Sequence, residues 1–192
     1  MGKEFELKYR ASVRQMEAIR EDHPGFREIA METTYYDTPE ATLAERRWTL
    51  RRRMENGVAV CTLKTPGENG VRNEWETECG DIQAAVPELC KLGAPDELGS
   101  LVSDGLVTVC GARFTRQAAL IEADGCTVEL ALDRGILLGG ARIDFLREVE
   151  VELKSGSREA AAAFGSALAS RYGLIPQGAS KYARALALSK MK

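Results

Sequence analysis

Charged and apolar residues alternate along several segments of this chain, with a period of two. Residues 4–8 read Glu-Phe-Glu-Leu-Lys, and residues 150–154 read Glu-Val-Glu-Leu-Lys. A period of two places successive side chains on opposite faces of a β-strand. The two copies therefore predict two strands, each with one apolar face and one charged face.

Similar patterns, punctuated by glycine and proline, predict the other elements. Strands are expected at 3–10, 26–37, 46–54, 57–65, 71–79, 106–117, 118–124, 126–133 and 145–154. Helices are expected after Ser12, whose spacing to Gln15 fits a capping box, at 39–45 behind Thr38, at 158–172 between Ser157 and Gly173, and at 181–188. Residues 81–102 have a helical composition that Pro87 and Pro95 are expected to break or kink.

These elements predict an α+β fold with about eight strands and flanking helices. Most strands follow one another through short turns, so the sheet is expected to be largely antiparallel. Eight strands can close into a barrel. No linker-like or low-complexity segment divides the chain, so residues 1–192 are expected to form a single domain.

Charged residues gather on one face of six of these strands. The sets are Glu4, Glu6 and Lys8; Thr49, Arg51 and Arg53; Thr62 and Lys64; Arg72, Glu74 and Glu76; Glu129 and Asp133; and Glu148, Glu150, Glu152 and Lys154. For any single strand, exposure to bulk water is the simpler explanation. Six faces built almost entirely of charges favour a barrel whose charged faces line a water-filled bore and whose apolar faces pack against helices outside.

Composition narrows the function further. The 192-residue chain has a net charge of −3, one histidine and five cysteines without a Cys-x-x-Cys pair. A nucleic-acid partner is not expected because such proteins are usually basic. A membrane partner is not expected because no apolar run approaches the ~20 residues of a membrane span. The scattered cysteines indicate a cytoplasmic protein with reduced thiols, and the single histidine disfavours zinc and catalytic-triad chemistry.

Eight motifs in order along residues 3–188 resemble the CYTH superfamily, also called triphosphate tunnel metalloenzymes. They are Glu4-x-Glu6-x-Lys8, Tyr36-Asp37-Thr38-Pro39, Leu50-Arg51-Arg52-Arg53, Thr62-Leu63-Lys64, Arg72-x-Glu74-x-Glu76, the 129–135 and 148–156 segments, and Ser180-Lys181-Tyr182-Ala183-Arg184. The resemblance implies an eight-stranded antiparallel β-barrel that forms a tunnel for a triphosphate.

The resemblance also implies roles for individual residues. Mg²⁺ or Mn²⁺, as two ions, would be held by Glu4, Glu6, Asp133, Glu150 and Glu152. The triphosphate would be bound by Lys8, Arg51, Arg53, Lys64 and Lys181, together with Arg113 or Arg116. Catalysis is expected from Glu4, Glu6, Lys8, Glu150 and Glu152, while Arg72 and Lys154 are expected to form structural ion pairs.

Three activities occur on this fold: hydrolysis of inorganic triphosphate, hydrolysis of thiamine or nucleoside triphosphates, and cyclisation of ATP. The Asp-Thr-Pro and Leu-Arg-x-Arg contexts favour the stand-alone bacterial inorganic triphosphatases, and a non-catalytic polyphosphate or nucleotide sensor is a further alternative. The expected partner is a small-molecule triphosphate, and the family also allows a homodimer. No aromatic residue is expected on the charged faces, because Trp48 and Trp75 have the parity of core residues.

Overall fold

The computed structural model describes residues 2–68 and 71–191. The strands are β1 (Gly2–Glu4), β2 (Glu6–Arg10), β3 (Arg27–Asp37), β4 (Thr49–Glu55), β5 (Val58–Pro66), β6 (Arg72–Glu78), β7 (Val107–Ala123), β8 (Cys126–Gly139), β9 (Arg142–Gly156) and β10 (Ile175–Pro176). The helices are α1 (Val13–Asp22), α2 (Thr42–Glu45), α3 (Ile82–Lys91), α4 (Glu97–Leu101), α5 (Arg158–Tyr172) and α6 (Lys181–Lys190).

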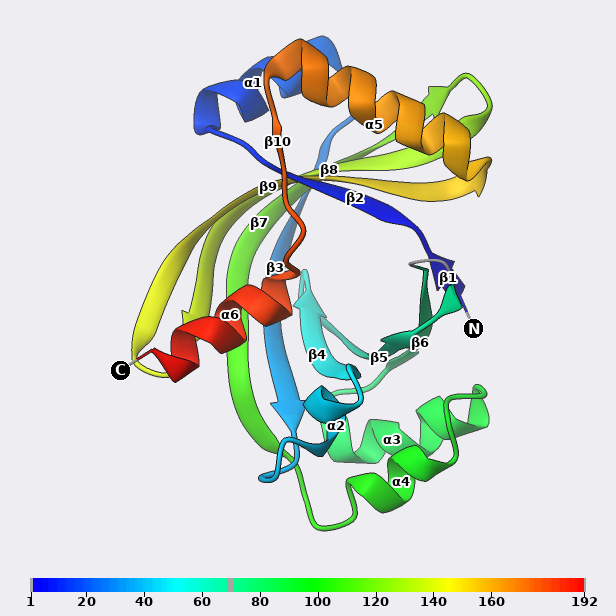
Figure 1. The fold of residues 1–192 in the computed structure, drawn as a ribbon, viewed down its shortest axis with the longest axis vertical. Coiled ribbons are helices and arrows are strands. Elements are labelled where there is room, and N and C mark those ends of the chain that lie inside the picture. The colour runs from blue at the N-terminus through cyan, green and yellow to red at the C-terminus, as the bar shows by residue number, and fades with distance from the viewer. Residues whose placement is uncertain (1, 69–70, 192) are drawn as a thin grey trace.

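The strands form one antiparallel sheet that curves around a central space (Figure 1). Its order is β1-β6-β5-β4-β3-β7-β8-β9-β2-β10, so β1 lies at one end and β2 lies near the other. Only Phe5 separates these two strands in the sequence. The N-terminal segment therefore pairs with β6 through β1 and with β9 through β2, and it links the two ends of the sheet. With β1 and β2 taken together, eight long strands surround the space, as the sequence predicted.

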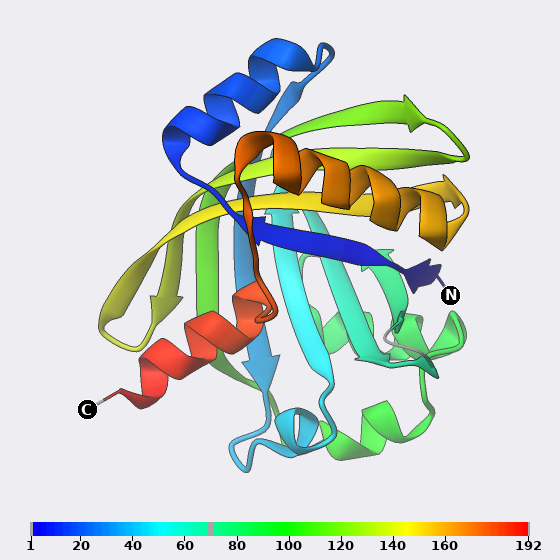
Figure 2. The same ribbon diagram turned by 45° about the horizontal axis from the view of Figure 1, so that its top comes forward.

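Helices cover the outer face of the sheet in two places (Figures 1 and 2). Helices α1 and α5 pack over β2, β8 and β9, where Ile19 and Leu168 meet Val128, Val149 and other apolar residues. A separate core lies beneath α3 and α4. It consists largely of Trp48, Leu50, Leu63, Trp75, Ile82, Leu89 and Leu98. Both tryptophans are therefore core residues, and the apolar strand faces pack outward against helices as predicted.

Helix α6 lies on the opposite, inner face of the sheet. Its Ala185 packs with Phe114, Leu137 and Leu146, which have the inward parity of β7, β8 and β9. Gly139 permits this approach, since a Cβ there would lie 2.3 Å from the Ala185 carbonyl oxygen. The expectation that the inner face is charged throughout is thus wrong at this end, where the inward residues are apolar and α6 covers them.

Several helix boundaries follow the predicted local signals. Ser12 and Gln15 form the capping box of α1, and Ser157 caps α5, which ends at Gly173 in the left-handed conformation. Helix α2 begins later than predicted, at Thr42. Thr38 and Asp37 both accept from its backbone amides: Thr38 Oγ1 from Thr42, and Asp37 Oδ1 and Oδ2 from Leu43 and Ala44.

Three boundaries in the middle and second half of the chain differ from the prediction. Pro87 lies inside a continuous α3, so only the Pro95 region separates two helices. Strand β7 runs through Ala118 and Ala119, which are both buried and so interrupt the alternation on which the predicted boundary rested. Strands β8 and β9 extend to a hairpin at 140–141, because their ends pair with each other beside α6.

Candidate active site

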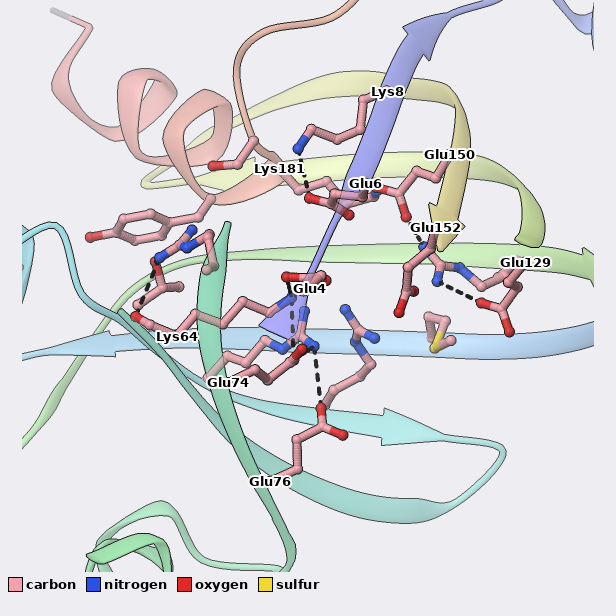
Figure 3. A pocket seen from close by; sticks show the side chains of 18 of the residues that line it. Glu4, Glu6, Lys8, Lys64, Glu74, Glu76, Glu129, Glu150, Glu152 and Lys181 are labelled. Carbon is pink, nitrogen blue, oxygen red and sulfur yellow. Dashed lines mark hydrogen bonds and ion pairs between the residues drawn. The ribbon is translucent and has the colours of Figure 1, made fainter. Parts of the chain in front are cut away.

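The inner faces of the strands enclose a cavity of about 270 Å³ (Figure 3). Among the residues that the structure describes, its lining contains eight carboxylates and eight cationic side chains. The carboxylates are Glu4, Glu6, Glu55, Glu74, Glu76, Glu129, Glu150 and Glu152. The cations are Lys8, Arg51, Arg53, Lys64, Arg72, Arg116, Lys154 and Lys181. Charges of both signs are therefore balanced within one confined space.

A row of carboxylates crosses three neighbouring strands. Glu6 on β2 is paired in register with Glu152 on β9, which is paired with Glu129 on β8. Each of the first two is held by a lysine of its own strand: Lys8 Nζ lies 2.7 Å from Glu6 and Lys154 Nζ lies 2.8 Å from Glu152. Glu129 was not among the expected site residues, although its shared parity with Asp133 is the signal that could have identified it.

A second group of charges links β1 to β4, β5 and β6. Lys64 Nζ lies 2.5 Å from Glu4 and 3.2 Å from Glu74. Arg51 lies 3.7 Å from both Glu74 and Glu76. The sequence placed Glu74 and Glu76 on a charged face without assigning them to the site, and the structure brings both into the cavity (Figure 3).

Lys181 lies among three buried carboxylates. Its ammonium nitrogen is 2.8 Å from Asp133, 2.5 Å from Glu148 and 2.6 Å from Glu150. Carboxylate oxygens of these three residues lie within 4.8 Å of one another, a spacing compatible with a metal ion, but the ammonium itself occupies this position. Lys181 is buried and lies at the start of α6, so the ion pairs fix this helix to the barrel.

Asp133 differs in position from the other expected metal ligands. Its carboxylate is fully buried, is absent from the cavity lining, and accepts from Arg116 at 2.8 and 2.7 Å as well as from Lys181. Asp133 as a metal ligand stays a prediction, and the structure places it behind the cavity lining rather than in it. Asp133 holds two cations in place there, and Arg116 also pairs with Glu150.

Burial and neighbouring charges shift the pKa values of this network. Burial opposes the charged forms of Arg116 and Lys181, but Asp133 and Glu150 outweigh it and raise both pKa values. Burial also acts against the Glu150 anion, yet Lys181 and Arg116 hold its pKa well below the usual range. Lys8 follows the same rule, because its pKa is raised by Glu6 despite burial. These groups are therefore charged at neutral pH.

Two arginines of β4 are compensated only in part, since Arg51 has Glu74 and Glu76 at 3.7 Å but each arginine keeps a buried donor without a partner among the described residues. The Nε atoms of Arg51 and Arg53 are buried without a hydrogen-bond partner among the described residues. Within the described part of the chain, the carboxylate that pairs with Arg53 is that of Glu55, at 3.3 Å. Burial lowers the pKa of Arg53, and the like charges of Arg51 and Arg116 lower it further. Buried donors of this kind are costly unless they are paired, so the arrangement is suited to an anion.

The structure separates the two candidate arginines of β7. Arg116 lines the cavity. Arg113 points outward, its side chain is 64% exposed, and it pairs with Glu32 at 3.0 Å on the outer surface. Residues 113 and 116 have opposite parity on one continuous strand, so only one of them can face the cavity. That residue is Arg116.

Aromatic side chains also reach the cavity, against expectation. Tyr35 and Tyr182 both line it, and their ring centroids lie 5.2 Å apart. Tyr35 is only 3% exposed, so its ring is packed rather than open for stacking. Parity did not identify Tyr35 because β3 carries charged residues on both faces, Arg27 and Asp37 on one and Glu28 and Glu32 on the other, so charge does not mark its inward face.

The donor set of the cavity fits a hard divalent cation. Glu4, Glu6, Glu150 and Glu152 supply carboxylate oxygens from adjacent strands, and such ligands suit Mg²⁺ and Mn²⁺. Histidine and cysteine are absent from the described lining residues, which disfavours a zinc site.

The described helices include none that is both long and apolar enough to cross a membrane.

Comparison with known proteins gives consistent results. An inorganic triphosphatase of Haemophilus influenzae is 32% identical over 126 residues, which are 65% of this chain but 36% of that protein, so the chain matches about a third of its length. A protein of Pyrococcus horikoshii OT3 has a similar structure, with a TM-score of 0.65, 25% identity, and coverage of 98% of this chain and 99% of the other.

A further similar structure is that of a Hippeastrum protein, a proposed adenylyl cyclase described as having a dominant triphosphatase activity. It has a TM-score of 0.66 and 19% identity, and the match covers 100% of this chain and 98% of the other. Finally, the family model of the CYTH domain matches residues 2–186. This chain therefore belongs to the CYTH domain family.

Proposed function

We propose that this chain is a divalent-metal-dependent triphosphatase that hydrolyses inorganic triphosphate to pyrophosphate and phosphate inside the barrel. The observation that carries the proposal is the pair Arg51 and Arg53, whose buried Nε donors lack partners in a cavity where most other cations hold carboxylates. Guanidinium groups bind phosphate oxygens with fixed, often bidentate geometry. A phosphate chain along β4 would supply acceptors for the Nε donors of these two residues.

The number of charges suits a triphosphate rather than a single phosphate. The cavity that contains Arg51 and Arg53 is also lined by Lys8, Lys64 and Arg116. Five cations from four strands (β2, β4, β5 and β7) therefore surround the same cavity. Each of Lys8, Lys64 and Arg116 is now held by a carboxylate. Phosphate oxygens would replace some of these contacts, which releases carboxylates such as Glu4 and Glu6 to bind metal.

Glu4, Glu6, Glu150 and Glu152 are the residues that would hold the metal. Bound there, a divalent ion would neutralise phosphate charge and lower the pKa of a coordinated water. The chain itself positions the substrate: the arginines fix phosphate oxygens, and Lys8 places a point charge beside Glu6. Catalysis then consists of positioning and electrostatic stabilisation, with no covalent intermediate.

Glu150 has an additional task. It holds Arg116 and Lys181 while facing the cavity, so it connects the substrate-binding face to the buried network behind it. Its lowered pKa keeps it ionised and able to bind a cation throughout the neutral range.

Inorganic triphosphate is favoured over ATP because the described lining is mainly charged along its length and its tyrosines are packed against each other. Base recognition usually requires an accessible stacking face. We expect a kcat/KM for triphosphate at least ~10-fold above that for ATP, a difference of about 1.4 kcal/mol.

The test compares triphosphate, ATP and thiamine triphosphate under identical conditions with Mg²⁺ or Mn²⁺. Cyclic AMP as the main product from ATP would show a cyclase instead. Tight binding of triphosphate without turnover would show a sensor. Preferential hydrolysis of either organic triphosphate would contradict the assigned substrate.

A further inference from the structure

A second concave region adjoins the cavity between α2 and α6. This groove of about 500 Å³, here called the outer groove, is lined by Ala44, Arg47, Thr49, Arg72, Tyr182 and a face of α6 that includes Leu186 and Lys190. Thr49, Arg72 and Tyr182 line the cavity as well. The outer groove is therefore continuous with one end of the site.

The charges of the outer groove are of one sign. Arg47, Arg72 and Lys190 line it, and no carboxylate is among its described lining residues. The cavity differs, since its cations and carboxylates are equal in number. An unbalanced group of cations at the mouth of a phosphate-binding cavity favours further negative charge at this position.

Arg72 stands at the junction of the two regions. Its Nη2 donates to the Arg47 carbonyl at 3.3 Å, the Thr49 hydroxyl at 3.2 Å and the Lys64 carbonyl at 3.3 Å. No carboxylate among the described residues lies within 4.0 Å of it, so the expected structural ion pair is not formed. Arg72 is thus a half-buried cation that is held in position by neutral oxygens and keeps its charge available to an anion.

Arg47 has an unfavourable backbone conformation that Arg72 supports. Its φ of 58° is in the left-handed region, which is unfavourable for a residue other than glycine. Glycine would adopt this conformation without that cost. The presence of arginine instead of glycine at this position therefore indicates that the side chain has a role other than maintaining the fold.

We propose that the outer groove is a subsite for the phosphates of a linear polyphosphate that extend beyond the triphosphate held in the cavity. The inference rests on the proposed function, because it assumes that the cavity binds a triphosphate. The opposite end of β4 does not offer an equivalent exit, because the lining there includes a carboxylate, Glu55, beside Met31. A carboxylate at that end would repel further phosphates. A longer chain would accordingly leave the cavity past Arg72 and lie against Arg47 and Lys190.

The test measures dissociation constants for inorganic triphosphate and tetraphosphate by calorimetry, in metal-free buffer so that no turnover accompanies binding. The variants are Arg47→Gly, Lys190→Ala and the double variant. Arg46→Ala is the matched control, because Arg46 is the exposed neighbour of Arg47 and is not among the lining residues. ATP serves as a third ligand that would place a nucleoside in the outer groove.

We expect wild-type protein to bind tetraphosphate more tightly than triphosphate. The ratio of the two constants should fall about threefold in each single variant and about tenfold in the double variant, in line with exposed charge pairs, and the effect should weaken with added salt. Arg46→Ala should match wild type. Arg47→Gly should melt no lower than wild type, which separates loss of charge from loss of fold.

Equal affinity for the two polyphosphates, or equal ratios in the groove variants and Arg46→Ala, would overturn the proposal. A loss confined to ATP would also overturn it and would identify a nucleoside as the occupant. Failure of the proposed function is a different result: it would appear as absent hydrolysis of triphosphate with metal, whatever the binding ratios are.

Discussion

Neighbouring arginines on β4 show how a single residue's face decides its role. Arg53 faces the cavity, whereas Arg52 lies on the other face and donates through Nη1 to the Gly80 carbonyl oxygen at 2.9 Å. The Nε atoms of both are buried without a hydrogen-bond partner among the described residues, so only the direction of the side chain distinguishes them. The two side chains are chemically identical and adjacent in sequence. A comparison of their variants therefore isolates the contribution of the cavity.

Arg53→Ala should weaken triphosphate binding by roughly 1–3 kcal/mol, the range for a charge-assisted hydrogen bond. Its melting temperature should stay the same or rise, because the change removes a buried cation that lies beside Arg51 and Arg116. Arg52→Ala should leave triphosphate kinetics at wild-type values. Initial rates and thermal unfolding of both variants provide the measurement, and equal effects of the two substitutions would exclude a specific role for Arg53.

At the scale of elements, α6 is the part of the fold that the sequence described least well. Its position on the inner face depends on Leu137, Leu146 and Gly139, which lie far from it in sequence, and no local pattern contains that information. The helix itself was predictable, since Ser180 caps it.

Lys181→Met tests the role of α6, and the structure changes the expected result. Because its ammonium is shared by Asp133, Glu148 and Glu150, its loss should destabilise the fold by on the order of 3 kcal/mol rather than only weaken substrate binding. For a chain of this length, that corresponds to a decrease in melting temperature of roughly 5–10 °C.

The size of this decrease should depend on pH. Lys181 has a raised pKa, so its stabilising contribution is fully present at neutral pH and below. In the variant, Glu148 and Glu150 lose the cation that lowers their pKa values and take up protons more readily as the pH falls. The gap in melting temperature between wild type and variant should therefore narrow from pH 8 to pH 5. A gap that widens over this range would contradict the assigned ion pairs.

Strand parity explains how much of the site was predictable. A period of two correctly grouped Glu4, Glu6 and Lys8, and Arg51 with Arg53, since all five line the cavity. It could not show that Asp133 is covered by Arg116 and Lys181, since burial depends on the side chains of other elements. The sequence can show which side chains point inward, but how deeply each one is buried depends on the packing of the assembled barrel.

On the scale of the whole molecule, the cavity is a balanced set of charges. Eight carboxylates and eight cations line it among the described residues. Divalent metal alone would add positive charge, and triphosphate alone would add negative charge, whereas both together nearly cancel. The two should therefore bind cooperatively, and each should raise the affinity for the other by the same factor.

Thermal unfolding can measure this coupling. Mg²⁺ and triphosphate added together should raise the melting temperature by more than the sum of their separate effects, because ligands that bind the native state stabilise it in proportion to their affinity. Matched salt and the Arg53→Ala variant serve as controls. Strictly additive shifts would indicate that metal and phosphate occupy independent sites.

The most direct test of the central claim is the initial rate of phosphate release from inorganic triphosphate as Mg²⁺ or Mn²⁺ is titrated and then chelated, in wild type and Glu6→Gln. Glu6 is a cleaner probe than Glu150, which also holds Arg116 and Lys181. We expect hydrolysis that requires the metal and falls by at least ~10²-fold in Glu6→Gln, because a charged ligand is lost. Hydrolysis that persists after chelation, near-wild-type turnover by Glu6→Gln at saturating metal, or no turnover of triphosphate by wild type would contradict the account.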